Sequence, residues 1–128
     1  MIETTVNEVL GSWAENFGEG SLEGMVGLYS PQALFYGSNA ELLRGKDGVR
    51  TYFTRNLRSP GEAEVEFRSV VAEAVGDNHI NLAGVAAFRI GSQEVAMRLT
   101  LTLVREDAAW LIATHHTSLT PVIEGVTH

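Results

Sequence analysis

The sequence predicts an α+β domain in which three helices precede a run of antiparallel strands. Two observations support this fold class. Apolar residues recur every three or four positions up to about residue 58, and every second position from residue 62 onward. Helices and consecutive strands that are segregated in this way are typical of an α+β fold and not of a doubly wound parallel sheet. With 128 residues and no linker or internal repeat, the chain is expected to form a single domain over residues 1–128.

The helical segments are recognised by their apolar stripes and by their end signals. Thr4 or Thr5 can cap the first, and Glu8 stands three residues after Thr5, at the reciprocal position of a capping box. The second starts at the N-cap residue Ser21 and ends at a Ser-Pro pair, because the residue before proline disfavours helical geometry. The expected helices cover residues 3–18, about 21–30 and about 47–58.

Four long strands are expected in the second half of the chain. Turn-forming residues at 76–78, 91–92 and 105–107 divide this half into alternating segments. The strands begin near residue 62 and then cover 79–90, about 94–105 and about 109–119. Two short extended pieces, Ala33–Tyr36 and Leu42–Arg44, are expected between the helices.

The composition excludes several classes of function. Sixteen acidic residues against nine basic ones give a net charge of −7, which argues against nucleic acid or an anionic membrane as a partner. The chain has no cysteine, so disulfides, thiolate metal sites and cysteine nucleophiles are excluded. The sequence has no apolar segment long enough to span a membrane and no P-loop or GxGxxG motif, and because residues 1–10 lack a basic start and an apolar run, no signal peptide is expected. A cytoplasmic protein without a cofactor is therefore expected.

Most of the residues with chemical potential lie between Met97 and Pro121. On a regular strand one face becomes polar toward its end, as the wall of a pocket does, and it comprises Trp110, Ile112, Thr114, His116 and Ser118. His115 and His116 would point to opposite faces and could not chelate one metal, so no metal site is expected. The alternative interpretation is that this polar end is simply where a strand leaves the core.

Arg98 stands in the middle of the preceding strand. Its own face is semi-polar, whereas the other face is unbroken and apolar, from Val95 to Leu103. An arginine in a central strand needs a buried partner or an anionic ligand. Because three helices cannot easily cover every strand, one face of the sheet is also expected to meet a second subunit in a homodimer.

The chain resembles the nuclear transport factor 2-like superfamily along nearly its whole length. The resemblance lies in Trp13 and Phe17, in the segments LYSPQALFYGS (28–38) and GKDGVRTYF (45–53), and in the strand of Trp110. It implies a cone in which a curved antiparallel sheet wraps around the helices and leaves a pocket at one end.

Within that superfamily, the final strands resemble the association domain of calcium/calmodulin-dependent kinase II. Arg98 matches an arginine of that domain's pocket, and Thr117 replaces a second arginine. The matches to its W-x-I-x-x-x-H-x-S-x-x-P run are Trp110, Ile112, His116, Ser118 and Pro121.

The same strand also resembles the iota class of carbonic anhydrases, whose ending HHHSS corresponds to residues 114–118 here. That family's pocket also uses a tyrosine, matched by Tyr52, and a threonine, whose nearest counterpart is Ser38.

These observations predict a stand-alone domain that binds a small anionic or carbonyl-bearing molecule. His116 would act as acid or base, Ser118 would orient it, and Tyr52 and Ser38 would complete the catalytic set. Further ligand contacts are expected from Arg98, Thr100, Thr114, Trp13, Tyr36 and Trp110. The alternatives are a metal-free carbonic-anhydrase-like lyase, a polyketide-cyclase-like or isomerase-like enzyme, and an assembly module with a vestigial pocket.

Overall fold

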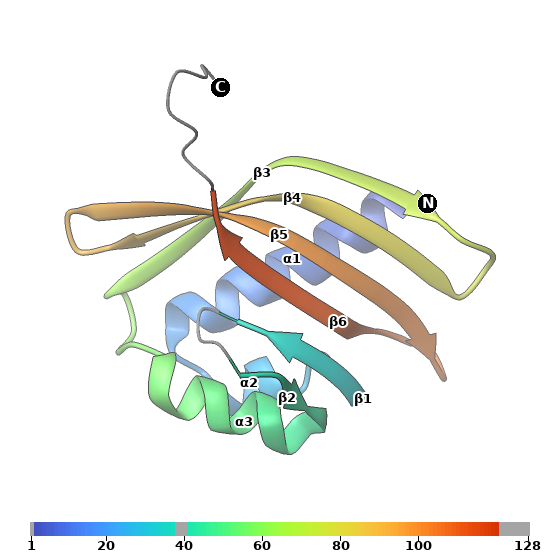
Figure 1. Cartoon of the computed structure of the whole chain (residues 1–128), viewed down its shortest axis with the longest axis horizontal. Helices are drawn as coiled ribbons and strands as arrows, with labels where there is room; N and C mark the ends of the chain where they lie inside the picture. The colour runs from blue at the N-terminus through green and yellow to red at the C-terminus, as the bar shows by residue number, and fades with distance from the viewer. Residues whose placement is uncertain (1, 38–40, 121–128) are drawn as a thin grey trace.

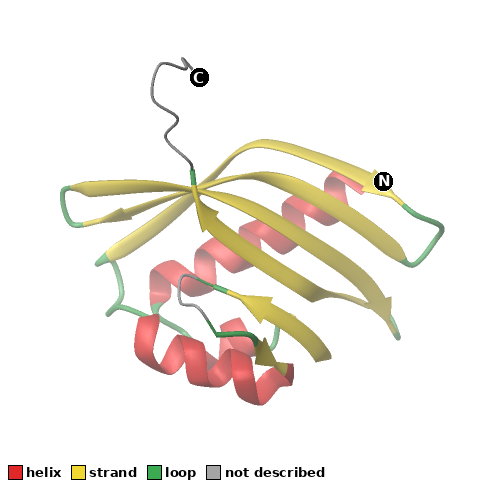
Figure 2. Ribbon diagram, viewed as in Figure 1, coloured by secondary structure: helices red, strands yellow, loops and turns green. Residues whose placement is uncertain are grey.

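The structure, a computed structural model, describes residues 2–37 and 41–120 and confirms the α+β class (Figure 1). Six strands form one curved sheet in the order β2-β1-β6-β5-β4-β3, and the helices lie on its concave side (Figure 2). The helices are α1 (Ile2–Glu19), α2 (Leu22–Val26) and α3 (Gly45–Asn56). The strands are β1 (Tyr29–Tyr36), β2 (Leu43–Arg44), β3 (Ala63–Ala74), β4 (His79–Ile90), β5 (Gln93–Glu106) and β6 (Ala109–Leu119). Within this part of the chain, no helix is long and apolar enough to cross a membrane.

The first two helices differ from the prediction at their ends. Because α1 already starts at Ile2, Thr4 and Thr5 lie inside the helix, and the predicted capping box is wrong. Ser21 is the N-cap of α2 as predicted, and its hydroxyl accepts a hydrogen bond from the backbone N–H of Gly24 at 3.1 Å.

The second helix is shorter than predicted because β6 draws the next segment into the sheet. The N–H of Ile112 donates to the carbonyl of Leu28 at 2.9 Å, and Tyr29 already pairs with Ile112 in the parallel β1–β6 ladder. Backbone pairing between distant segments therefore overrides the local helical stripe that had included Tyr29.

The sheet is bent where β3 crosses α1. The register of β3 shifts between Arg68 and Val71, and Ser69 in between has a positive φ of 55°, as in a β-bulge. Gly84 on β4 makes this close approach possible, because a Cβ at that position would lie 3.0 Å from Cγ2 of Val70 and 3.1 Å from the carbonyl oxygen of Arg68. The bulge and the glycine together let the sheet curve around the helices.

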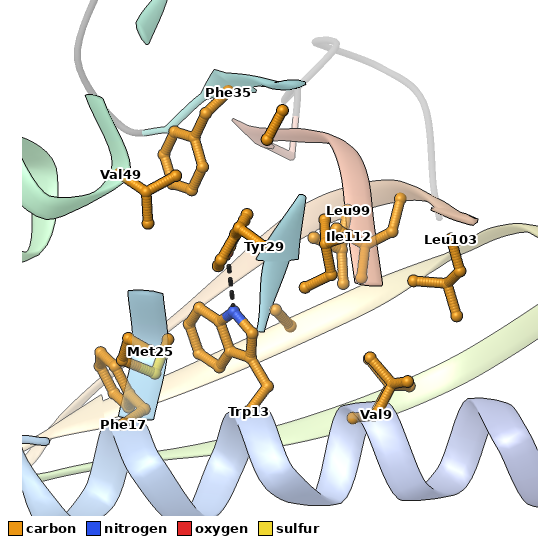
Figure 3. Packing of buried hydrophobic residues seen from close by; sticks show 14 of the residues in the cluster. Val9, Trp13, Phe17, Met25, Tyr29, Phe35, Val49, Leu99, Leu103 and Ile112 are labelled. Carbon is orange, nitrogen blue, oxygen red and sulfur yellow. Dashed lines mark hydrogen bonds between the residues drawn. The ribbon is translucent and has the colours of Figure 1, made fainter. Parts of the chain in front are cut away.

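The buried core joins the apolar stripe of α1 to the concave face of the sheet (Figure 3). The stripe comprises Val6, Val9, Leu10, Trp13 and Phe17, all of which the 3.6-residue period predicts. On β5 the apolar face points inward, and Leu99, Leu101 and Leu103 are buried in the same cluster. The apolar side of β5 is thus covered within one chain, and the face that carries Arg98 is the outer one.

Candidate functional site

A cavity of about 230 Å³ opens between α1, α3 and one end of the sheet. Its inner wall is dominated by rings, which come from α1, β1, α3 and β4: Trp13, Phe17, Phe35, Tyr52, Phe53 and Phe88. His115 and Thr117 of β6 supply polar groups among these rings. Asn56, Arg58, Ile90 and Val95 also line the cavity and are exposed to solvent, so they form its mouth.

Three buried side chains from α1, β1 and β6 form a hydrogen-bonded chain that ends at the cavity. The indole Nε1–H of Trp13 donates to the hydroxyl of Tyr29 at 2.9 Å (Figure 3). The Tyr29 oxygen in turn lies 2.8 Å from Nδ1 of His115. Because an indole can only donate, the Tyr29 hydroxyl uses its own proton toward His115. Nδ1 of His115 is therefore the acceptor, and the imidazole proton is on Nε2.

Burial keeps both ends of the Tyr29–His115 bond neutral at ordinary pH. Removal from water raises the pKa of Tyr29 well above its usual value. It also lowers the pKa of His115 from 6.5 to about 3, and the nearby His116 lowers it further. His115 is thus a neutral imidazole that offers an Nε2–H donor, with its tautomer selected by the tyrosine.

Packing fixes the orientation of the His115 ring as well. The ring centroid lies 4.2 Å from that of Phe35, and the ring stacks on Tyr29 with the centroids 6.0 Å apart. Every fully buried side-chain nitrogen and oxygen in the described residues has a hydrogen-bond partner. Since the only bond recorded for this ring is through Nδ1, Nε2 faces the open space of the cavity and not a protein group.

A β-bulge in β6 explains why His115, and not His116, faces the cavity. Ile112 pairs with Leu103 and Thr114 pairs with Thr102, so Ala113 between them has no opposite residue on β5. The extra residue reverses the alternation beyond it. Ile112 and His115 consequently lie on the same inner face, and the prediction that His116 and Ser118 share the face of Trp110 and Ile112 is wrong.

Six of the predicted site residues lie together on the outer face of the sheet. Arg98 pairs with Ser118, and Thr100 pairs with His116 in the β5–β6 ladder. On β1, the ring of Tyr36 lies 5.6 Å from that of His116, and Thr114 occupies the same face. The structure therefore brings these residues together, but on the side of the sheet opposite the cavity, where Arg98 is exposed.

The remaining predicted residues have different positions. Tyr52 and Trp13 line the cavity. Trp110 is half-buried and packs against the core without lining the cavity. Ser38 lies outside the described residues. The described residues include no group of three His, Cys, Asp or Glu side chains that could hold a metal ion.

Sequence patterns identify Tyr52 among the polar residues of the cavity, but not His115, Thr117 or Arg58. His115 and Thr117 were assigned to the opposite face because nothing in the local sequence marks Ala113 as a bulge. The helix predicted over about 21–30 includes Tyr29, which lies at the start of β1, and the helix predicted over about 47–58 includes Arg58, which lies beyond the end of α3. A signal for Arg58 does exist, since it immediately precedes the Ser59-Pro60-Gly61 turn that leads from α3 toward β3.

Comparisons with known proteins agree with this architecture. Residues 6–123 match the model of a family described as the SnoaL-like domain. One similar solved structure is a protein from Xanthomonas campestris assigned as a calcium/calmodulin-dependent protein kinase II association domain, with a TM-score of 0.83, 21% identity, and coverage of 92% of this chain and 87% of that one. No curated protein matches the chain.

Two further structures extend the same similarity. A nuclear transport factor 2-like protein of unknown function from Pseudomonas putida KT2440 has a TM-score of 0.83 and 17% identity, covering 96% of this chain and 89% of that one. A protein from Streptomyces avermitilis, assigned as a dehydratase of the same family, has a TM-score of 0.81 and 12% identity, covering 93% and 96%. The matches confirm the nuclear transport factor 2-like fold.

Proposed function

The chain belongs to the SnoaL-like domain family, and from that premise we propose that it binds a small carbonyl-bearing or anionic molecule in the cavity. The observation that carries this proposal is the chain from Trp13 through Tyr29 to His115, which ends in an Nε2–H directed at open space. An aromatic wall with a few oriented polar groups is the usual composition of a small-molecule site.

The fixed direction of the donor supports a ligand with an oxygen acceptor. Nε2 of His115 is not a fully buried atom without a partner, but a ligand that covered it without offering an acceptor would cost about 1–3 kcal/mol. Two other buried side chains hold His115 in one tautomer, so the donor's direction is set before a ligand arrives. A ligand oxygen at Nε2 would satisfy the donor with little loss of conformational freedom.

A nuclear magnetic resonance titration tests the proposal. Aryl ketones, amides and carboxylates of one ring are added to the ¹⁵N-labelled protein, and the Trp13 indole and His115 ring signals are followed. We expect saturable shifts at these two residues and at Tyr52, with the Trp110 indole as an internal control because it lies outside the cavity. A compound set that moves none of the cavity signals at millimolar concentration would rule the proposal out.

A second candidate function, metal-free hydration of carbon dioxide, is favoured by one specific observation. Tyr52, His115 and Thr117 line the same cavity, and they supply the hydroxyl and imidazole groups that the resemblance to the iota-class carbonic anhydrases requires. Because the pKa of His115 is lowered to about 3, its role in the empty cavity would be to donate to a substrate oxygen and not to accept a proton.

The lyase candidate is tested by stopped-flow hydration of carbon dioxide. The wild type is compared with Thr117→Val, which removes one cavity hydroxyl, and with Ser118→Ala, which removes the adjacent hydroxyl on the outer face. If the candidate is correct, Thr117→Val lowers the rate at least tenfold and Ser118→Ala leaves it unchanged. A wild-type rate equal to that of buffer would eliminate the candidate.

We also propose that the chain forms a homodimer through the outer face of its sheet. Leu34 and Tyr36 of β1 are 43% and 42% exposed on this face, next to the exposed Thr114 and His116 of β6. Exposed apolar side chains that lie together favour burial in an interface. The similar structure from X. campestris is assigned as an association domain, which supports self-association of this fold.

Sedimentation equilibrium tests the dimer. Tyr36→Glu would place a charge in the interface and is expected to give a monomer, whereas Thr51→Glu on the exposed side of α3 adds the same charge elsewhere and serves as the control. A wild type that remains monomeric at high micromolar concentration would refute the dimer.

A further inference from the structure

We propose that the cavity selects flat keto acids and binds them in one direction, with a neutral ketone at His115 and the carboxylate at the mouth beside Arg58. This inference rests on the proposed ligand-binding function and adds to it the class of ligand and its orientation. It assigns a binding role to Arg58, a residue that the pattern of the sequence did not identify.

The inner end of the cavity favours a neutral acceptor over a charged one. The polar groups there are the neutral imidazole of His115 and the hydroxyls of Thr117 and Tyr52, and the side chains of His115 and Thr117 are buried. The surrounding surface consists of aromatic rings, and no lysine or arginine among the described residues lines this inner part. A carboxylate moved to this end would lose its hydration without gaining a cation, whereas a ketone loses far less.

The mouth offers the opposite environment. Arg58 lines the cavity there and is exposed, and within the described chain it forms no ion pair. No carboxylate is found among the described residues that line the cavity. A ligand carboxylate at the mouth would therefore meet an available guanidinium and would keep part of its hydration.

The position of Arg58 is tied to the end of α1. Gly20 has a positive φ of 67°, and a Cβ at Gly20 would lie 2.3 Å from the carbonyl oxygen of Arg58. The N–H of Gly61 donates to the carbonyl of Gly18 at 3.0 Å on the other side of the same turn. The segment that carries Arg58 thus packs closely against the end of the helix that contributes Trp13, so the position of the mouth is fixed relative to the inner end of the cavity.

The shape of the cavity restricts the body of the ligand. Its volume of about 230 Å³ is below the range of roughly 300–1,000 Å³ that holds drug-sized ligands. Trp13, Phe53 and Phe88 present ring edges and faces, and the Trp13 and Phe53 rings are 70° apart in orientation. Planar groups pack well against such rings. A single ring with polar groups at opposite ends satisfies these conditions.

Three probes built on one benzene ring separate the contributions of the inner end and of the mouth of the cavity. 4-Acetylbenzoate carries both polar groups, acetophenone only the ketone, and 4-ethylbenzoate only the carboxylate. Their dissociation constants are measured by nuclear magnetic resonance titration, with the Trp13 indole signal as reporter. We expect 4-acetylbenzoate to bind most tightly, and 4-ethylbenzoate at least tenfold more weakly because it leaves His115 Nε2 without an acceptor.

Arg58→Gln tests the mouth and Arg98→Gln is its matched control. Since an exposed ion pair contributes little, we expect Arg58→Gln to weaken the binding of 4-acetylbenzoate about three- to fivefold and to leave the binding of acetophenone unchanged. Arg98→Gln removes the same charge from the outer face and should change neither constant. The ¹⁵N shift of His115 Nε2 in the wild type provides a readout that needs no substitution, and it should move with both ketones and not with 4-ethylbenzoate.

The outcomes are distinguishable. The orientation would be overturned if 4-ethylbenzoate and 4-acetylbenzoate bound equally well, or if Arg58→Gln lowered the affinity for all three probes equally. Either result would leave the cavity as a binding site. If no probe shifts any cavity signal, the proposed binding function fails and the inference fails with it.

Discussion

The Tyr29 hydroxyl and Nδ1 of His115 lie 2.8 Å apart, although 86 positions separate the two residues in the chain. This bond joins β1 to β6, the one parallel pair of the sheet, at the buried end of the cavity. The Tyr29 hydroxyl accepts from Trp13 and donates to His115, so that one hydroxyl satisfies two buried nitrogens. Four predictions follow from this and related contacts.

Tyr29→Phe removes the shared hydroxyl and keeps the ring. The indole N–H of Trp13 and Nδ1 of His115 both lose their recorded partner, and each unsatisfied buried group costs about 1–3 kcal/mol. We expect the free energy of unfolding in urea to fall by about 2–4 kcal/mol. Tyr36→Phe, on the exposed outer face, should change it by less than about 0.5 kcal/mol. Equal effects of the two variants would show that the buried bonds contribute nothing.

The stability of the protein should depend on pH through His115. Its pKa is about 3 in the folded chain and 6.5 in the unfolded one, so between these values the unfolded chain binds a proton that the folded chain does not. The free energy of unfolding therefore falls as the pH falls through this window, by up to about 1.4 kcal/mol per unit.

The contribution of His115 is isolated by urea unfolding between pH 6 and 4.5. We expect His115→Phe to have a smaller slope than the wild type, whatever its stability at pH 7. If His115→Phe and the wild type gave parallel curves, the imidazole would not be excluded from protonation in the folded state.

Two glycine-to-alanine substitutions should have opposite signs. At Gly84 the new methyl group would lie about 3.0–3.1 Å from Val70 and the Arg68 carbonyl, and overpacking of this kind costs about 1–3 kcal/mol. At Gly11, in the exposed interior of α1, nothing lies within 4 Å, and alanine should stabilise by about 0.5–1 kcal/mol through its helix propensity. Thermal unfolding of both variants checks the signs, and a stabilised Gly84→Ala would contradict the bend described for β3.

Lys46 fixes the start of β1 and thereby the position of Tyr29, whose hydroxyl bonds His115. Its ammonium group donates to the carbonyl of Tyr29 at 2.7 Å and to that of Val26 at 3.1 Å. Lys46→Met keeps the aliphatic stem, and we expect it to lower the free energy of unfolding by about 1–3 kcal/mol. Lys46→Arg, which retains the donors, should recover part of the loss. Nuclear magnetic resonance should also show a change at His115 in the methionine variant, and an unaltered His115 signal would argue against this linkage.

Much of the fold could be predicted because local signals and tertiary structure agree. Turn residues at 76–78 and 91–92 set the limits of β4, which runs from His79 to Ile90 as predicted. The stripe of α1 was identified completely because a helix that covers a sheet must bury one face. Ser21 caps α2 because its hydroxyl meets an N–H only three residues away. Each of these features depends on neighbours in the chain.

The candidate site was predicted less well because its residues meet across the sheet. Trp13 and Tyr52 were identified as cavity residues, since both belong to helical stripes that point inward. His116 and Ser118 lie on the face opposite to the predicted one, because a strict period of two does not hold through Ala113. The sequence left the face of Arg98 open, and the structure places it beside Ser118 as the predicted companion. A slip of one residue moves every following side chain to the other face of a strand.

By itself, the sequence determined the α+β class, the presence of three helices, the approximate limits of β4, β5 and β6 and the aromatic character of the interior, because these depend on local geometry and on hydrophobic periodicity. Only the tertiary structure decided which histidine faces the cavity. The bulge at Ala113 arises from the pairing of β6 with β5. The partner of His115 comes from β1, a strand whose start is set by its own pairing with β6. Such contacts join segments that are far apart in the chain, and no local pattern records them.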